Sequence, residues 1–138
     1  MSLAATQLSE IRKLLSKDEI IEPSSPLYAQ ETRVWASQKQ QNPSVVIRPR
    51  SILSLQTTLQ YLCNSTLDFS IRSGGLGSSS AKDAVVSMTA FSEVVFNPEE
   101  ETVLVGAGQT WGEVDRKLAE LAPGYVGMLS TLYAADLI

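Results

Sequence analysis

The sequence predicts an α+β fold in which a small parallel βαβ layer is followed by an antiparallel hairpin region and a C-terminal helix. Three patterns predict this fold. Between residues 45 and 72, two short apolar runs flank an apolar stripe of helical spacing. Between residues 94 and 105, two further apolar runs flank a five-residue loop of turn-forming and acidic residues. A capping-box pattern at Thr110 then begins a last helical segment.

The N-terminal segment predicts an amphipathic helix, because apolar residues recur at helical spacing with polar residues on the other side. These apolar positions are Leu8, Ile11, Leu14 and Leu15. Residues 22–26 (EPSSP) contain two prolines and break the pattern. Residues 27–43 are mixed and polar, and we expect a loop there with room for a short helix.

The βαβ unit is predicted from residues 45–72. Val45–Ile47 is a β-branched run ended by Pro49, which is typical of a buried strand. Ser51 is then placed to cap a helix. The stripe of that helix consists of Ile52, Leu55, Leu59 and Leu62. Residues 69–72 (FSIR) form the next strand, and such a unit implies parallel strands with a right-handed crossover.

The remaining elements follow a glycine- and serine-rich loop. Residues 85–88 have the composition of a strand. Residues 94–96 and 102–105 flank the loop 97–101, whose glutamates we expect to be exposed to solvent. In the last helix, Thr110 is the N-cap and Glu113 the third helical residue. Its apolar face carries Val114, Leu118 and Leu121, and it ends before Pro123-Gly124.

Composition excludes several classes of function. A chain of 138 residues with 43% hydrophobic residues fits one globular domain. The formal net charge of −4 and the absence of basic clusters argue against a nucleic-acid partner. No apolar run reaches the length of a membrane span or of a signal peptide's core, so we expect no membrane association and a cytoplasmic location.

The sequence has no histidine and one cysteine, Cys63. The absence of histidine removes the Ser-His and Cys-His nucleophile systems and the commonest ligand of zinc and non-haem iron, so we expect no metal site. We expect Cys63 to be a small core residue. No pair of carboxylates is placed for acid–base work, and the sequence assigns no catalytic residue.

The candidate ligand-binding segment is the loop that begins at Arg72 (RSGGLGSSS). Its glycines let a ligand approach the backbone, and successive N–H groups in such a loop can bind a diphosphate. The hydroxyls of Ser73 and Ser78 are further candidate donors. A flexible turn is the alternative interpretation of the same composition. The P-loop is excluded because no lysine follows Gly77, and the dinucleotide fingerprint is excluded by its glycine spacing.

Four segments resemble consecutive landmarks of one flavoprotein family. They are NPSVVIRPRS at 42–51, FSIRSGG at 69–75, SMTAF at 87–91 and VGAGQTWGEV at 105–114. In order and spacing they are similar to the N-terminal part of the FAD-binding PCMH-type domain of berberine-bridge-enzyme-like FAD-linked oxidases, in the vanillyl-alcohol-oxidase superfamily. The resemblance implies FAD as cofactor. It implies that one continuous run of residues wraps the FAD diphosphate: Arg72, Ser73, Gly74, Gly75, Leu76, Gly77 and Ser78. Arg72 is included mainly because it orders the end of the strand.

The sequence departs from the family pattern in ways that bear on the cofactor. Leu76 stands where the bicovalent members carry the histidine of the flavin 8α bond, so any FAD is expected to be noncovalent. The family's Gly-x-Cys segment is replaced by residues 128–138. We therefore expect a truncated, incomplete PCMH-type domain without a substrate domain. The expected organisation is an N-terminal helix and linker (1–27), a partial FAD-binding domain (28–127) and a divergent tail (128–138).

Three functions remain open from the sequence. The first is a truncated FAD-linked oxidoreductase-like protein of small-molecule (secondary) metabolism, acting on a metabolite. The second is a flavin-free interaction module, or a cofactor-independent catalyst on a metabolite, that dimerises through an incomplete sheet. The third is a relic without activity. Because an incomplete sheet exposes a strand edge, we expect a homo-oligomer or a completing partner chain.

Overall fold

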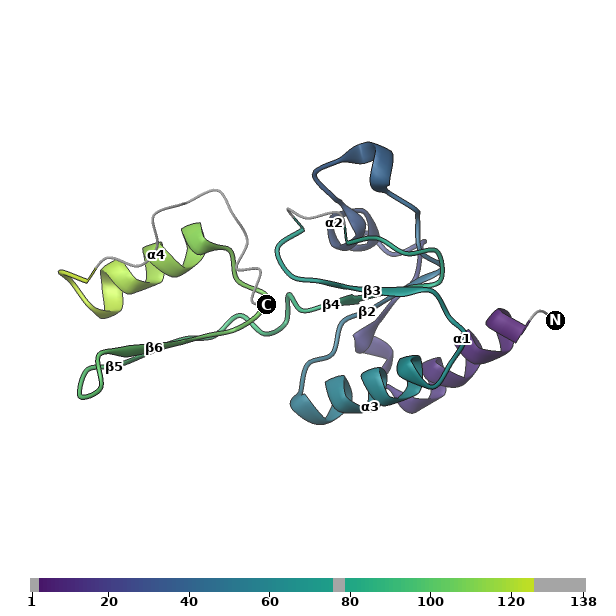
Figure 1. Cartoon of the computed structure of the whole chain (residues 1–138), viewed down its shortest axis with the longest axis horizontal. Helices are drawn as coiled ribbons and strands as arrows, with labels where there is room; N and C mark the ends of the chain where they lie inside the picture. The colour runs from purple at the N-terminus through teal and green to yellow at the C-terminus, as the bar shows by residue number, and fades with distance from the viewer. Residues whose placement is uncertain (1–2, 76–78, 126–138) are drawn as a thin grey trace.

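The computed structural model describes residues 3–75 and 79–125, which fold into two lobes (Figure 1). The α+β prediction is confirmed. In chain order the elements are α1 (Leu3–Leu14), η1 (Lys17–Glu19), β1 (Ile20–Ile21), α2 (Tyr28–Thr32), η2 (Ser37–Lys39), β2 (Val45–Ile47), α3 (Ile52–Cys63), β3 (Phe69–Arg72), β4 (Ala84–Ser87), β5 (Val94–Asn97), β6 (Thr102–Val105) and α4 (Trp111–Leu121).

The first lobe is built on a four-stranded sheet with the order β1-β2-β4-β3. Strands β2 and β3 both run parallel to β4, as the βαβ pattern predicted, and β1 is antiparallel to β2. The two strands of the predicted unit are not neighbours, because β4 lies between them. Burial explains this order. Every residue of β4 is buried, whereas Ile71 of β3 is 47% exposed at the edge of the sheet.

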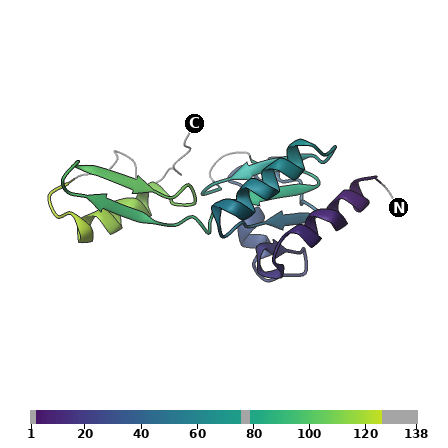
Figure 2. The ribbon, with the colours of Figure 1, turned by 90° about the horizontal axis from the view of Figure 1, so that it is seen from below.

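Helices cover both faces of this sheet (Figures 1 and 2). Helices α1 and α3 pack on one face, and α2 packs on the other. The larger hydrophobic cluster lies under α1 and α3 and contains Leu8, Ile11, Val45, Ile47, Leu62, Leu67, Ala84 and Val86. A smaller cluster lies on the α2 side, where Tyr28 packs against Ile21, Val46 and Val85. Both faces of the central strands are thus removed from water, which accounts for their uninterrupted apolar sequence.

Helix α3 begins as predicted, and its predicted stripe is buried at Leu62 and half-buried at Leu55 and Leu59 but is exposed at Ile52. The Ser51 hydroxyl accepts a hydrogen bond from the Ser54 amide at 3.1 Å, which confirms the N-cap. Ile52 is 71% exposed in the first turn, and Thr58 is fully buried with its hydroxyl donating to the Ser54 carbonyl. The prediction that Cys63 lies in the core was wrong. Cys63 is exposed at the helix end, beside the buried stripe position.

The second lobe is the antiparallel β5–β6 hairpin with α4 packed against it (Figure 1). Asn97 pairs with Thr102, so the connecting loop is one residue shorter than predicted. The outer face of the hairpin carries Val95 and Leu104, which lie opposite each other and are 52% and 66% exposed. In α4, the Glu113 carboxylate accepts from the Thr110 amide at 2.9 Å.

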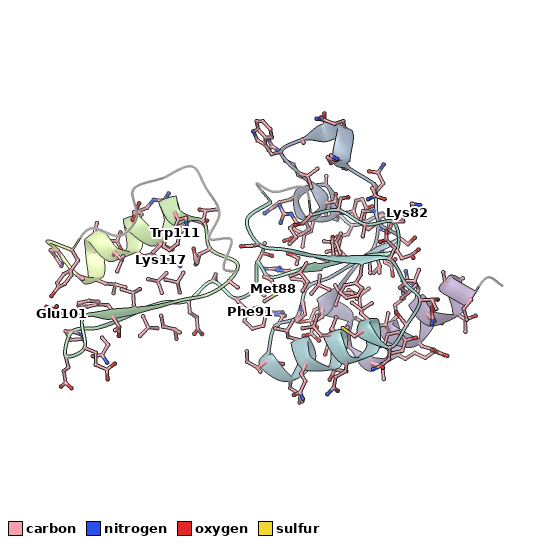
Figure 3. All side chains as sticks on the ribbon, viewed as in Figure 1. Lys82, Met88, Phe91, Glu101, Trp111 and Lys117 are labelled. Atoms are coloured by element: carbon pink, nitrogen blue, oxygen red, sulfur yellow. The ribbon has the colours of Figure 1, made fainter. Side chains whose placement is uncertain are left out.

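Two glycines allow the lobes to meet closely. Figure 3 shows Met88 and Phe91 in the segment that leads from β4 toward the hairpin. The Gly108 amide donates to the Phe91 carbonyl at 2.9 Å, and the Gly106 amide donates to the Glu93 carbonyl at 2.8 Å. A Cβ atom at Gly108 would overlap the Met88 carbonyl. Backbone therefore lies directly on backbone at this junction.

Glu19 joins the N-terminal segment to the start of α3, and this contact predicts a dependence of stability on pH. Glu19 is 6% exposed, and its carboxylate accepts from the amides of Arg50 at 2.8 Å and Ser16 at 3.2 Å. Burial raises the pKa of Glu19, but hydrogen bonds to Ser54, Arg50 and Ser16 outweigh it and lower the pKa below 4.5. The stabilisation is therefore complete above pH 4.5 and is lost as the pH falls through the folded-state pKa.

We expect Glu19→Gln to lower the free energy of unfolding at neutral pH by about 1 to 2 kcal/mol, because hydrogen bonds to a charged acceptor are lost. The deficit should shrink well below pH 4.5, where the wild-type carboxyl is also neutral. Urea unfolding of both proteins at the two pH values measures this. An equal deficit at both would assign the effect to packing rather than to charge.

Candidate functional site

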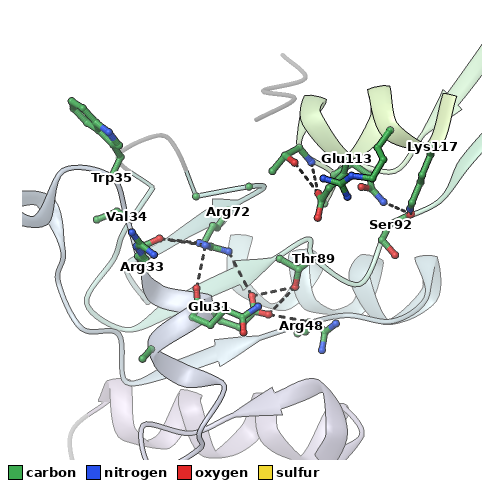
Figure 4. Close-up of a pocket in the computed structure, with 18 residues that line it drawn as sticks. Glu31, Arg33, Val34, Trp35, Arg48, Arg72, Thr89, Ser92, Glu113 and Lys117 are labelled. Atoms are coloured by element: carbon green, nitrogen blue, oxygen red, sulfur yellow. Dashed lines mark hydrogen bonds and ion pairs between the residues drawn. The ribbon is translucent and has the colours of Figure 1, made fainter. Parts of the chain in front are cut away.

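A cleft of about 950 Å³ opens at the C-terminal ends of the parallel strands (Figure 4). Arg48 follows β2, Arg72 ends β3 and Thr89 follows β4, and all three line the cleft. The far wall is formed by the loop before α4 and by α4 itself. Ligands of α/β sheets bind at the carboxyl ends of the strands, so the topology itself marks this cleft.

Glu31 of α2 lies at the centre of the near wall and is 2% exposed. Its carboxylate accepts hydrogen bonds from the hydroxyls of Ser87 at 2.5 Å and Thr89 at 2.9 Å. It also forms ion pairs with Arg72 at 3.6 Å and with Arg48 at 3.8 Å. Two cations and two hydroxyls thus compensate a carboxylate that would otherwise be costly to bury.

Arg72 is held by main-chain carbonyls in α2 and just after it. Its guanidinium donates to the carbonyls of Gln30 at 3.2 Å and Arg33 at 3.3 Å, and the residue is 7% exposed. Burial lowers the pKa of Arg72, and the neighbouring Glu31 opposes this shift. Arg72 therefore fixes the end of β3 where the predicted ligand loop begins.

The structure brings together the first residues of that predicted loop. Gly74 and Gly75 line the cleft, and among the described residues neither amide has an intrachain acceptor. The Ser73 hydroxyl donates to the Ala107 carbonyl at 2.5 Å, so this predicted ligand donor instead ties the loop to the second lobe. Leu76, Gly77 and Ser78 lie outside the described residues. The assignment of this segment to a cofactor stays a prediction.

The far wall is anchored to the segment between the lobes. Gln109 is 2% exposed, and its side-chain amide donates to the Ser92 carbonyl. The Lys117 ammonium donates to the same carbonyl at 2.7 Å. The hydrogen bond from the Thr110 amide lowers the pKa of Glu113, with Lys117 and Arg116 adding to this effect, although burial opposes it. Glu113 therefore stays ionised as a helix cap.

The described part of the cleft is rich in positive charge, although the chain as a whole is acidic. Five cationic side chains line it against two carboxylates, and both carboxylates have defined partners in the protein. The cations are Arg33, Arg48, Arg72, Arg116 and Lys117. Such a lining favours an anionic ligand. Within residues 3–75 and 79–125, no three metal-ligating side chains gather into a metal site, and no helix has the length and apolar character to cross a bilayer.

A protein-family model described as an FAD binding domain matches residues 43–131, more than half of the chain. The chain belongs to the FAD binding domain family. The family predicted from the sequence landmarks is thereby confirmed. The matched range includes the ligand loop, the segment between the lobes and α4, so the cleft is formed largely by the part of the chain that defines this FAD binding domain.

Individual relatives agree with this assignment. The FAD-dependent monooxygenase yanF of Aspergillus niger is 26% identical over 114 residues, which cover 78% of this chain and 20% of that protein. BBE-like 1 of Physcomitrella patens superposes with a TM-score of 0.65 at 18% identity, over 87% of this chain and 26% of that one. Xylooligosaccharide oxidase from Myceliophthora thermophila superposes with a TM-score of 0.69 at 16% identity, over 86% and 25%.

The two superpositions show a shared fold. The chain spans about a fifth of the length of the curated relative and about a quarter of the length of the two solved structures.

Sequence reasoning missed the charged part of the site in this FAD binding domain. Glu31 lies in a segment interpreted as a loop, and no local pattern indicates that its partners are Ser87 and Arg72. Arg48 carried a usable signal. A charged residue directly after a buried strand of a βαβ unit stands at the edge of the sheet where ligands bind.

Proposed function

We propose that this chain binds FAD noncovalently in the cleft, with the main chain of Gly74 and Gly75 at the diphosphate. The observation that carries the proposal is that these two residues line a cationic cleft while their amides have no acceptor among the described residues. Buried or half-buried N–H groups need partners, and a diphosphate supplies several acceptor oxygens to such a backbone loop. The family match to an FAD binding domain supports the same ligand.

Noncovalent attachment is supported by the residue types present. The sequence contains no histidine, and its one cysteine, Cys63, is exposed on α3 and is not part of the cleft lining. Neither a histidyl nor a nearby cysteinyl link to the flavin is therefore available within these residues. The cofactor would depend on backbone hydrogen bonds and on the positive charge of the cleft.

We further propose that the protein supports FAD-linked oxidation of a small metabolite, of the kind found in secondary metabolism. When bound, FAD supplies the acceptor for a hydride removed from such a substrate. The residues that line the cleft would bind and orient the cofactor: Gly74 and Gly75 would hold it through their main chain, Arg72 would fix these two glycines, and Arg33 and Arg116 would supply positive charge. The relative named as an FAD-dependent monooxygenase supports an oxidoreductase class.

Addition of FAD to the purified protein tests the proposal. We expect visible flavin absorbance to stay with the protein through gel filtration and to move to the supernatant after acid precipitation, because no covalent bond holds it.

We also expect the fluorescence of Trp35 to fall on titration with FAD, since Trp35 lines the cleft and is 79% exposed. Trp35→Phe, which leaves only Trp111, is the control for that signal. A protein that stays colourless after incubation with FAD would refute the proposed function, and flavin in the acid pellet would refute noncovalent attachment.

A further inference from the structure

The Glu31 cluster connects α2 to the carboxyl ends of three strands of the first lobe. Glu31 comes from α2, and the groups that contact its carboxylate come from the ends of β2, β4 and β3 and from the residues just after β4. Figure 4 shows Glu31 between Arg48, Arg72 and Thr89 on the near wall of the cleft. The Arg48 Nε is buried and has no hydrogen-bond partner among the residues that the structure describes. The charge of Glu31 is thus the main compensation for two cations beside the cleft.

Arg72 connects Glu31 to the start of the ligand loop, because its guanidinium pairs with Glu31 and contacts Gly75. Gly75 has a φ of +78°, and a Cβ atom there would overlap the Arg72 guanidinium and approach the Arg33 carbonyl to 2.9 Å. The guanidinium therefore lies directly against Gly75. A rotation of Arg72 away from Glu31 would remove the surface on which this residue of the loop rests.

We propose that Glu31 is a positioning residue for Gly74 and Gly75, acting through Arg72, and that the binding of FAD at these two glycines is coupled to the docking of residues 28–34. The inference rests on the proposed binding of FAD. Glu31→Gln keeps an oxygen that can accept from Ser87 and Thr89 but removes the negative charge. Arg72 then loses its buried counter-charge and keeps only its hydrogen bonds to main-chain carbonyls such as those of Gln30 and Arg33, so its present orientation is less strongly favoured.

The coupling must act in both directions, since a link between two sites is reciprocal. FAD bound at the loop should hold Arg72, and Arg72 should hold the Arg33 carbonyl, which accepts from its Nε and Nη2 at 3.3 Å. Trypsin cleaves the bond that contains this carbonyl. The Arg33 side chain is exposed, whereas Val34 is 5% exposed, so cleavage requires release of this main chain.

The first test compares FAD affinity in wild type, Glu31→Gln and Glu19→Gln. Glu19 is the matched control, because it is also a buried carboxylate but does not line the cleft. We expect Glu31→Gln to raise the Kd for FAD about tenfold or more, and Glu19→Gln to leave it within about twofold. Equal affinities of wild type and Glu31→Gln would overturn the inference while the proposed function stands. An equal loss in both variants would also overturn it, because a general loss of stability would then be the cause.

The second test is limited trypsin digestion of the wild type with and without FAD, and it needs no variant to fold. We expect FAD to slow cleavage after Arg33 severalfold and to leave cleavage after Arg50 unchanged, since the Arg50 side chain is exposed, pairs with Asp18 and does not line the cleft. In Glu31→Gln the protection after Arg33 should disappear at saturating FAD. Bound FAD without protection of Arg33 in the wild type would overturn the coupling. A wild type that fails to bind FAD would overturn the proposed function and this inference together.

Discussion

Gly75→Ala is expected to destabilise the protein by about 2 to 4 kcal/mol and to weaken FAD binding more than tenfold. Two causes act together. Gly75 has a φ of +78°, which an L-residue with a side chain adopts only at a cost. The new methyl group would also overlap the Arg72 guanidinium, which cannot move aside without losing its contacts to Glu31 and the Arg33 carbonyl.

Gly124→Ala provides a matched control for this experiment. Gly124 has a φ of +98°, but no atom of residues 3–75 and 79–125 lies within 4 Å of the position that its Cβ would occupy. Its replacement therefore reports the backbone cost alone, about 1 kcal/mol or slightly more. Urea unfolding of both variants, with FAD titration of each, separates the overlap with Arg72 from the cost of a positive φ. Equal destabilisation by the two substitutions would show that Arg72 moves freely and does not support the loop.

Gly108→Ala is expected to destabilise the protein by about 2 to 4 kcal/mol, by forcing the two lobes apart where their backbones touch. The added Cβ would overlap the Met88 carbonyl oxygen and approach its carbonyl carbon and the Thr89 Cα to 2.7 Å. These are main-chain atoms, so no rotamer change relieves the overlap. The hydrogen bond from the Gly108 amide to the Phe91 carbonyl would also be strained.

Hydrogen exchange and urea unfolding together measure this effect. The amides of Gly106 and Gly108 should lose protection in the Gly108→Ala protein, while those of β2 and β4 in the first lobe keep most of theirs. Gly124→Ala again serves as the reference, because the Cβ added there would overlap no described residue. If the free energy of unfolding of Gly108→Ala lies within about 0.5 kcal/mol of the wild-type value, the junction between the lobes can accommodate a methyl group and the prediction is wrong.

The local elements were predictable because each depends on nearby residues. The β-branched run 45–47, the Ser51 cap and the capping box of α4 each combine a short pattern with a physical cause, and the structure confirms all three. The position of β4 between β2 and β3 was not predictable in this way. Strand order is decided by which strand loses most surface to both layers of helices, and this depends on the whole lobe.

The same distinction between local and long-range determinants applies to the residues of the candidate site. The glycine loop after β3 could be proposed as a ligand-binding segment from its composition and from its place after a strand, and the structure places Gly74 and Gly75 in the cleft lining. Glu31, by contrast, has an unremarkable local sequence, and its partners are 17 to 58 positions away along the chain. Ile52 and Cys63 show the complementary error, since helical spacing alone does not tell where the covering sheet ends.

The small size of the β5–β6 hairpin lobe affects the local opening motions of the protein. Two strands with one helix make a small cooperative unit, and isolated two-stranded hairpins are marginal in water. The outward side chains of Val95 and Leu104 gain little from burial, so the hairpin depends on α4 and on its junction with the first lobe. Excursions of this unit away from the larger lobe would widen the cleft while the central sheet stays intact, because α4 and the loop before it form the far wall of the cleft.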